Sequence, residues 1–170
     1  MMLIILHIVL CIVTVVAQAT LSSSLSIYDV NPDFCLILAC LAGFLSNEYK
    51  GLMIGLTVGL LQDLLTPGGI GINMILKGLA GTLAGTTTHT VSTVTASAVV
   101  IVTLVLSLGC GLASLIVAYP ALDGSEAFHA ISWILVPQAL YNSFLAAGIF
   151  WLIHKFRPSF GVVHFAHGRR

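Results

Sequence analysis

Charged side chains are scarce in this sequence of 170 residues. Six lysines and arginines and six aspartates and glutamates make up 7% of the chain, and the formal net charge is zero. Because an ordinary soluble domain carries about a quarter charged residues, so few charges cannot cover a solvated surface. The lack of a basic excess also argues against nucleic acid as a partner. With 58% hydrophobic residues, the composition indicates a chain that is dissolved in lipid.

Clusters of reactive side chains are also missing. The four cysteines lie in or beside apolar segments without CxxC spacing, which is typical of small buried hydrophobic residues. No nucleophile or carboxylate pair stands near a plausible base, and the glycines at 68, 69 and 71 lack the continuation of a phosphate-binding loop. His164 and His167 are three residues apart, which is only a weak indication of a metal. We therefore expect no catalytic residue, no cofactor, no metal site and no enzymatic activity.

What the sequence does contain is a series of apolar runs. A membrane-spanning helix needs about 20 mostly apolar residues, so the chain has room for five or six spans and little else. The expected fold is an all-α polytopic integral membrane protein with about six transmembrane helices. It forms a single helical domain over residues 1–157, followed by a short basic tail at 158–170. The spans are expected near residues 2–21, 34–46, 51–65, 70–86, 95–119 and 131–153.

Some of these segments allow more than one interpretation. The first could be a signal peptide, because Ala17-Gln18-Ala19 looks like a cleavage site, but no Lys or Arg precedes it and its apolar core is long. The second and third are shorter than the hydrocarbon layer, so they are either two short spans or one re-entrant hairpin; we favour six spans. Pro137 inside the last span predicts a kink, tolerable where neighbouring groups satisfy the freed carbonyl.

The distribution of basic residues predicts the orientation. Four of the six lie at the C-terminal end, which should therefore be cytoplasmic. With six spans the N-terminus is cytoplasmic too, and the predicted outer loops hold acidic residues without a basic one. The residues behind this prediction are Lys155, Arg157, Arg169 and Arg170 inside, and Asp29, Asp33, Asp123 and Glu126 outside. The localisation expected is a multi-pass protein of the membrane with both termini in the cytoplasm.

Ionisable side chains inside apolar segments are costly, and each needs a partner. Asp63 lies near the end of the third segment and Lys77 lies within the fourth, so a lysine stem could reach an aspartate across the intervening turn. Such a pair would either staple two helices together or face a partner helix or a ligand cavity, and both interpretations stay open. Gln62, Asn73 and Asn142 also lie in or beside apolar segments, where amides hydrogen-bond between helices.

Glycines recur at helical spacing, in a GxxxGxxxG series in the third segment and a GxxxG pair in the fourth. In lipid, faces of small residues allow helix backbones to approach closely, so we predict tight packing, with an internal partner favoured over another protein. The glycines concerned are Gly51, Gly55 and Gly59 in the third segment, Gly78, Gly81 and Gly85 in the fourth, and Gly109 and Gly111, which indicate a similar flat patch in the fifth.

Several segments, taken in order, carry a resemblance to a known family. They are PDFCLIL at 32–38, GLLQDLL at 59–65, GINMILKGLAG at 71–81, and Ala139-Leu140-Tyr141-Asn142 in the last span with a basic exit at Lys155. Together, in a chain of this length, they resemble the rod shape-determining protein MreD family over most of residues 32–85 and 137–157. The first and fifth segments match only as hydrophobic stretches.

The resemblance implies a non-catalytic scaffold subunit of the bacterial elongation (Rod) complex in the inner membrane, which supports lateral peptidoglycan synthesis and rod cell shape. It implies as partners MreC, a class B penicillin-binding protein, the glycosyltransferase RodA and, indirectly, the MreB filament. The family is also similar at fold level to the S subunits of energy-coupling-factor transporters. The alternative is therefore a substrate-binding membrane subunit of a vitamin-type transporter, which should enclose a polar cavity.

Overall fold

The computed structural model describes residues 2–21, 24, 26, 30–65, 71–90 and 94–156, and the elements over these residues are all helical. They are α1 (Met2–Leu21), α2 (Phe34–Leu45), α3 (Glu48–Leu65), α4 (Ile72–Thr90), α5 (Ala96–Ala118), α6 (Gly124–Ala130), the π-helical turn η1 (Ile131–Leu135) and α7 (Val136–Phe156). The prediction of an all-helical protein is confirmed. The expected basic tail at 158–170, with His164 and His167, lies outside the described residues.

Local sequence explains where several helices begin and end. α2 begins after Asp33, whose carboxylate accepts a hydrogen bond from the Leu36 N–H at 2.9 Å. α3 begins three residues before the expected position, because the Asn47 side chain accepts the Lys50 N–H and satisfies a free donor of its first turn. α5 begins after Thr95, whose hydroxyl accepts the Ala98 N–H.

The last helical segment differs most from its prediction. α6, η1 and α7 form one helix of 33 residues, Gly124–Phe156, which begins seven residues before the expected start. Pro137 has no N–H to donate and disturbs the ordinary helical ladder. The widened turn η1 directly precedes it, and there the Val136 N–H donates to the Ile131 carbonyl instead. This local π adjustment lets the helix pass the proline without ending.

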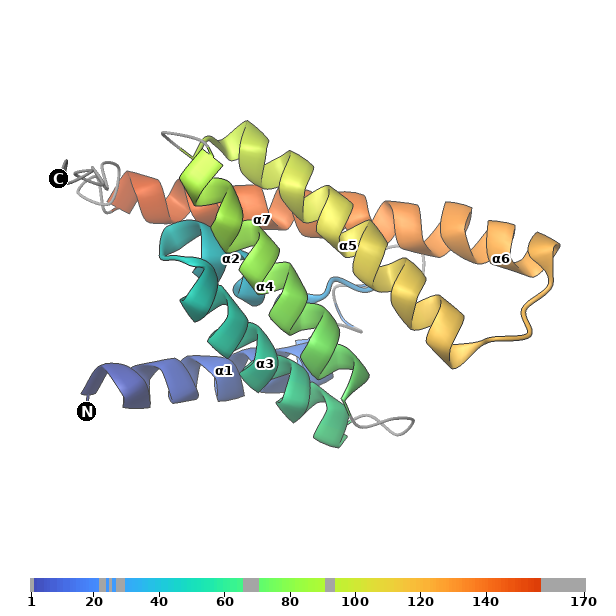
Figure 1. Ribbon diagram of the computed structural model, residues 1–170, viewed down its shortest axis with the longest axis horizontal. Coiled ribbons are helices and arrows are strands. Elements are labelled where there is room, and N and C mark those ends of the chain that lie inside the picture. The colour runs from blue at the N-terminus through green and yellow to red at the C-terminus, as the bar shows by residue number, and fades with distance from the viewer. Residues whose placement is uncertain are drawn as a thin grey trace, which may run out of the picture.

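Figure 1 shows how the helices are arranged. α1 and α7 run along the long axis, and α3 and α4 cross it side by side. α5 lies against α7, and the α5–α6 end of the molecule extends beyond the ends of α1 to α4. The molecule therefore has a group of four helices, α1–α4, and a longer helix pair formed by α5 and α6–α7.

The short helix α2 forms the centre of the core. Nine of its 12 residues are buried, and its Leu36, Cys40 and Phe44 pack in one hydrophobic cluster with small residues of α4 and with Phe150 of α7. The outer faces of α1 and α5 carry exposed apolar side chains such as Ile101 and Ile116. This inside-out distribution of apolar surface fits a chain surrounded by lipid. Two helices, Ala96–Ala118 and Gly124–Phe156, are long and apolar enough to cross a membrane.

Candidate functional site

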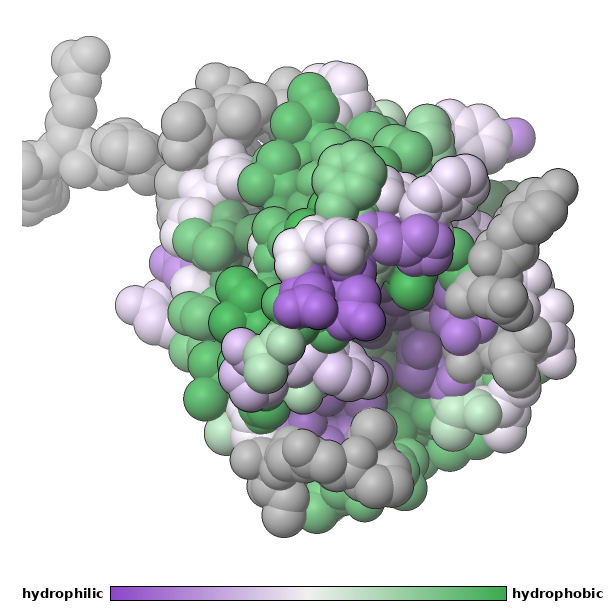
Figure 2. Space-filling model, turned by 90° about the vertical axis from the view of Figure 1, so that its right-hand side faces the viewer, coloured by the Kyte–Doolittle hydropathy of each residue, from purple (hydrophilic) through white to green (hydrophobic). Residues whose placement is uncertain are grey.

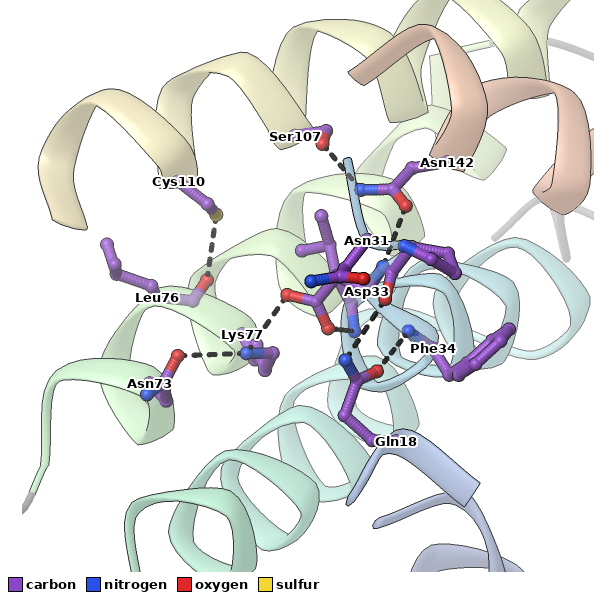
Figure 3. Close-up of polar contacts among 12 residues, drawn as sticks. Gln18, Asn31, Asp33, Phe34, Asn73, Leu76, Lys77, Ser107, Cys110 and Asn142 are labelled. Atoms are coloured by element: carbon purple, nitrogen blue, oxygen red, sulfur yellow. Dashed lines mark hydrogen bonds and ion pairs between the residues drawn. The ribbon is translucent and has the colours of Figure 1, made fainter. Parts of the chain in front are cut away.

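Polar side chains converge on the segment just before α2 (Figure 3). From α1, the Gln18 amide donates to the Pro32 carbonyl at 3.0 Å and accepts the Phe34 N–H at 2.7 Å. From α7, the Gln138 amide donates to the Asn31 carbonyl at 2.8 Å. Since backbone groups in a lipid-surrounded protein must be satisfied internally, these contacts allow an irregular segment to lie among the helices.

Asp33 links this segment to three further elements. Its N–H donates to the Asn142 side-chain oxygen of α7 at 2.9 Å, and one carboxylate oxygen caps α2. The other carboxylate oxygen lies 3.2 Å from the Lys77 Nζ of α4. Asp33, half-buried, lies at the start of the central helix α2. The negative charge of its carboxylate neutralises the buried Lys77 ammonium.

The Lys77 side chain is buried, with only 4% of its surface exposed. Besides Asp33, its ammonium donates to the Asn73 side-chain oxygen one turn earlier in α4 at 2.9 Å. An ammonium buried in an apolar protein is stable only when paired and hydrogen-bonded. Lys77 meets this condition through one neighbouring helix segment and its own helix.

Asp63 has a different role from the one expected. Its carboxylate accepts hydrogen bonds from the N–H groups of Gly71, Asn73 and Met74, and from the Asn73 side chain, at 2.9 to 3.2 Å. It therefore satisfies the free donors at the beginning of α4, where the positive end of the helix dipole also favours an anion. The predicted direct Asp63–Lys77 pair is wrong. Asn73 stands between the two, bonded to both, because the first turn of α4 takes up the carboxylate and Lys77 turns toward α2.

Asn142 and Ser107 extend the network across the second helix group. The Asn142 amide of α7 donates to the Ser107 hydroxyl of α5 at 2.9 Å, in a buried contact. Cys110, one turn further along α5, donates weakly to the Leu76 carbonyl of α4 at 3.6 Å. Continuous polar contacts thus connect α1, α2, α4, α5 and α7 around Asp33. Gln62 lies apart from them, and its buried side-chain oxygen has no hydrogen-bond partner among the described residues.

The glycines of α3 lie directly on the backbone of α4. A Cβ at Gly51 would overlap the Gly81 carbonyl, one at Gly55 the Lys77 carbonyl, and one at Gly59 the Asn73 carbonyl. Gly81 and Gly85 meet Gly51 and Glu48 in the same way, and Gly78 makes room for the Leu56 side chain. The glycine series is an internal seam. The two glycines of the flat patch expected on α5 differ: Gly109 is exposed and a Cβ there would meet no described atom within 4 Å, whereas a Cβ at Gly111 would press on the Leu135 side chain of η1. Only the Gly111 part of the patch packs against another described element.

A cavity of about 310 Å³ lies on the other side of α4, between α4, α5 and the start of α7. Most of its polar lining belongs to the network just described, namely Asp33, Lys77, Asn73, Ser107, Gln138 and Asn142, and Ser114 and Tyr119 add to it. Its apolar lining includes Leu36, Leu76, Leu115 and Leu135. Figure 2 looks onto the end of the molecule that carries the α5–α6 turn, where hydrophilic residues gather around a hollow. Among the described residues, no group of three His, Cys, Asp or Glu side chains could hold a metal.

Sequence reasoning missed several members of this site. Gln18 attracted notice only as part of a cleavage-like motif, although an amide inside an otherwise apolar helix is itself a signal of an interhelical hydrogen bond. Ser107 gave a weaker signal, because a serine inside a helix commonly bonds a carbonyl of its own helix. Gln138, inside the helix Gly124–Phe156, gave the same kind of signal as Gln18. Asp33 was predicted as an acidic residue of an outer loop, and its partner Lys77 lies 44 residues further along the chain, so no local pattern indicated the pair.

These features define a helical membrane protein whose buried polar groups bind one another across its helices. The family comparison is specific: the family model of the rod shape-determining protein MreD matches residues 1–157. The chain belongs to the MreD family, a family with a role in determining rod cell shape. Comparison with curated proteins and with solved structures gave no match.

Proposed function

We propose that this chain is a non-catalytic scaffold subunit of the bacterial elongation (Rod) complex, which binds MreC and supports lateral peptidoglycan synthesis. The observation that carries the proposal is the family match over residues 1–157 of 170. The class B penicillin-binding protein and RodA are its further partners in the membrane, and the MreB filament is an indirect one. The protein acts by holding these components in a fixed relation.

The internal structure supports a holding role. Asp63, Asn73 and Asn142 each bond groups of this same chain, and the α3–α4 seam brings two backbones into direct contact. A protein built in this way can bind the helices of other proteins without changing its own structure. Since the glycine seam is occupied internally, the surfaces left for partner helices are the apolar outer faces of helices such as α1 and α5.

The proposed topology has six spans in the bacterial inner membrane, with both termini in the cytoplasm. α2 has 12 residues, about 18 Å of helix, which is shorter than the hydrocarbon layer of about 30 Å. The hydrogen-bonded segment before α2 completes this crossing inside the protein. Irregular backbone at such a depth is tolerated because Gln18, Gln138 and Asn142 satisfy it.

One observation favours the alternative function, a substrate-binding membrane subunit of a vitamin-type transporter. Such a subunit needs a polar cavity, and the cavity beside α4 has polar and charged groups in its wall. A scaffold has no need of this space.

Affinity purification of the tagged full-length chain from native membranes in a mild detergent distinguishes the two functions. A scaffold of the Rod complex should recover MreC and the penicillin-binding protein, and depletion of the chain should turn rod-shaped cells round. A tagged polytopic membrane protein of similar abundance and unrelated function is the control. Recovery of a transporter's ATPase pair, with unchanged cell shape on depletion, would contradict the scaffold and support the alternative.

A further inference from the structure

The cavity beside α4 presents its two charged groups unequally. The Asp33 side chain is 22% exposed, whereas the Lys77 side chain is 4% exposed. A carboxylate oxygen has two lone pairs, and each Asp33 oxygen uses one, toward the Leu36 N–H or the Lys77 ammonium. A molecule in the cavity therefore meets a carboxylate that can accept further hydrogen bonds before it meets the ammonium.

The hydrogen-bonded chain behind the cavity also carries an excess of negative charge. It runs from Asp63 through Asn73 and Lys77 to Asp33, and so contains two carboxylates and one ammonium. The nearest compensation for Asp63 is the N-terminal turn of α4, which supplies only partial positive charge. In a low-dielectric environment, a cation beside Asp33 is favoured, and an anion is repelled.

The rest of the wall suits an apolar molecule of small size. The lining follows α5 from Ser107 to Tyr119, about 18 Å along the helix. Toward the Tyr119 end it includes the apolar side chains of Leu115, Ala118 and Leu135, with Ser114 and Tyr119 as polar members. A volume of about 310 Å³ is at the lower end of the range of pockets that hold small organic ligands, which are mostly apolar with a few polar groups that fix orientation.

We propose that this cavity binds a small organic amine, with its protonated nitrogen at the Asp33 carboxylate and its apolar body along α5 toward Tyr119. The ligand would touch α2, α4, α5 and α7 together, and so would bind the α1–α4 group to the α5 and α6–α7 pair. This site is additional to the scaffold role and does not depend on it.

Cys110 provides a natural reporter, because it lines the cavity while Cys11, Cys35 and Cys40 are buried. In a full-length chain with these three changed to alanine, the thiol of Cys110 is labelled with water-soluble methanethiosulfonates. The cationic trimethylammonium-ethyl reagent should react about tenfold faster than the anionic sulfonato-ethyl reagent, each rate taken relative to a free thiol in solution. This ratio reports the sign of the charge that an entering molecule meets.

Binding is tested by protection of Cys110 with three probes of one shape. Phenethylamine carries the charge that the site should accept, phenylethanol is its neutral counterpart, and phenylpropionate is its anionic counterpart. Phenethylamine at millimolar concentration should slow labelling about fivefold or more, and the other two should slow it less than twofold, because only the protonated amine is attracted by the Asp33 carboxylate. Purified protein in detergent at neutral pH is used throughout.

Two variants connect protection to the carboxylate. Asp33→Asn keeps the cap of α2 but removes the charge, and the double change Asp33→Asn with Lys77→Gln avoids an unpaired buried ammonium if the single variant folds poorly. Either one should abolish the difference between the three probes, whereas Asp123→Asn, at an exposed carboxylate outside the cavity, should preserve it. Equal protection by all three probes, protection that persists in the double variant, or a Cys110 that reacts with neither reagent would each overturn the proposal.

Discussion

Helix α4 contacts α3 on one side and α5 on the other, and the two contacts are built differently. Toward α3, glycines bring the two backbones so close that an added Cβ would overlap a carbonyl group. Toward α5, buried apolar side chains such as Ala84 and Val99 share a cluster near the start of α5. Further along, a weak thiol contact joins the helices at Leu76, and the cavity separates them from Ser107 onward. One face of α4 is filled by main chain, and the other is bridged by side chains.

The difference shows how one helix can serve two purposes. Backbone contact has no adjustable part, so the α3–α4 seam fixes the position of α4. Side chains that reach across a gap can change their partners, so the α5 side can admit water or a small molecule. Lys77 lies at the boundary: its carbonyl is covered by Gly55 in the seam, and its ammonium belongs to the cavity wall.

The largest expected effect comes from breaking the bridged side at Lys77. Lys77→Met leaves Asp33 as an unpaired half-buried carboxylate, and loss of one partner of a buried pair destabilises by about 3–5 kcal/mol. We expect this loss in the free energy of unfolding, measured in detergent by denaturant titration, with lower abundance in membranes. Lys50→Met, at an exposed position, is the control. Asp33→Asn added to Lys77→Met should recover most of the stability, and no recovery would show that the pair itself is unimportant.

The next largest effect comes from opening the seam. Gly55→Ala places a Cβ on the Lys77 carbonyl, so the two helices must separate, and overpacking of this kind destabilises by about 1–3 kcal/mol. Gly109→Ala is the matched control, because a Cβ there meets no described atom within 4 Å, and alanine favours a helix over glycine. Thermal unfolding in detergent should show a lowered midpoint for the first and an unchanged or raised one for the second. Equal midpoints would mean that the seam is not tightly packed.

A loss of about the same size as that of Gly55→Ala, or smaller, is expected from Asn142→Leu. This change removes the acceptor of the Asp33 N–H and the donor to Ser107, and a buried group left unsatisfied costs about 1–3 kcal/mol. Ser107→Ala removes a single partner and should cost less, about 1 kcal/mol. Hydrogen exchange of the Asp33 amide provides a local measurement, with faster exchange in Asn142→Leu but not in Ser107→Ala. Identical exchange in both variants would place the control of the α2 start elsewhere.

The smallest effect is expected at a buried hydroxyl of α5. Thr103 on α5 is fully buried, and its hydroxyl has no hydrogen-bond partner in the described part of the chain. Thr103→Val keeps the shape and removes an unsatisfied polar group, so stability should be unchanged or raised by up to about 1 kcal/mol. Thr103→Ala, which leaves a small void, should instead be destabilising by about 1 kcal/mol. The sign difference is measured by denaturant titration of the two variants side by side.

The sequence predicted the helices well and their polar partners poorly. Apolar runs are continuous along the chain, so α1, α2 and α5 could be located to within a residue or two at each end. The spacing of Gly51, Gly55 and Gly59 indicated a packed face because three consecutive turns share it. The partner of Lys77 could not be predicted in the same way, because pairing depends on which helices meet in space. Asp63 is the nearer aspartate in the sequence, but Asp33 is the one that Lys77 contacts in the structure.

The unbroken helix Gly124–Phe156 has a consequence for mechanics. Its 33 residues span about 50 Å, against a hydrocarbon layer of about 30 Å. A straight rod of this length in a bilayer must either lean steeply or stand clear of it at one end. The same rod holds Asn142 at the start of the central helix, about 27 Å from Gly124. A displacement of the Gly124 end of this helix would therefore also move Asn142, and with it the hydrogen bond to the Asp33 N–H at the start of α2.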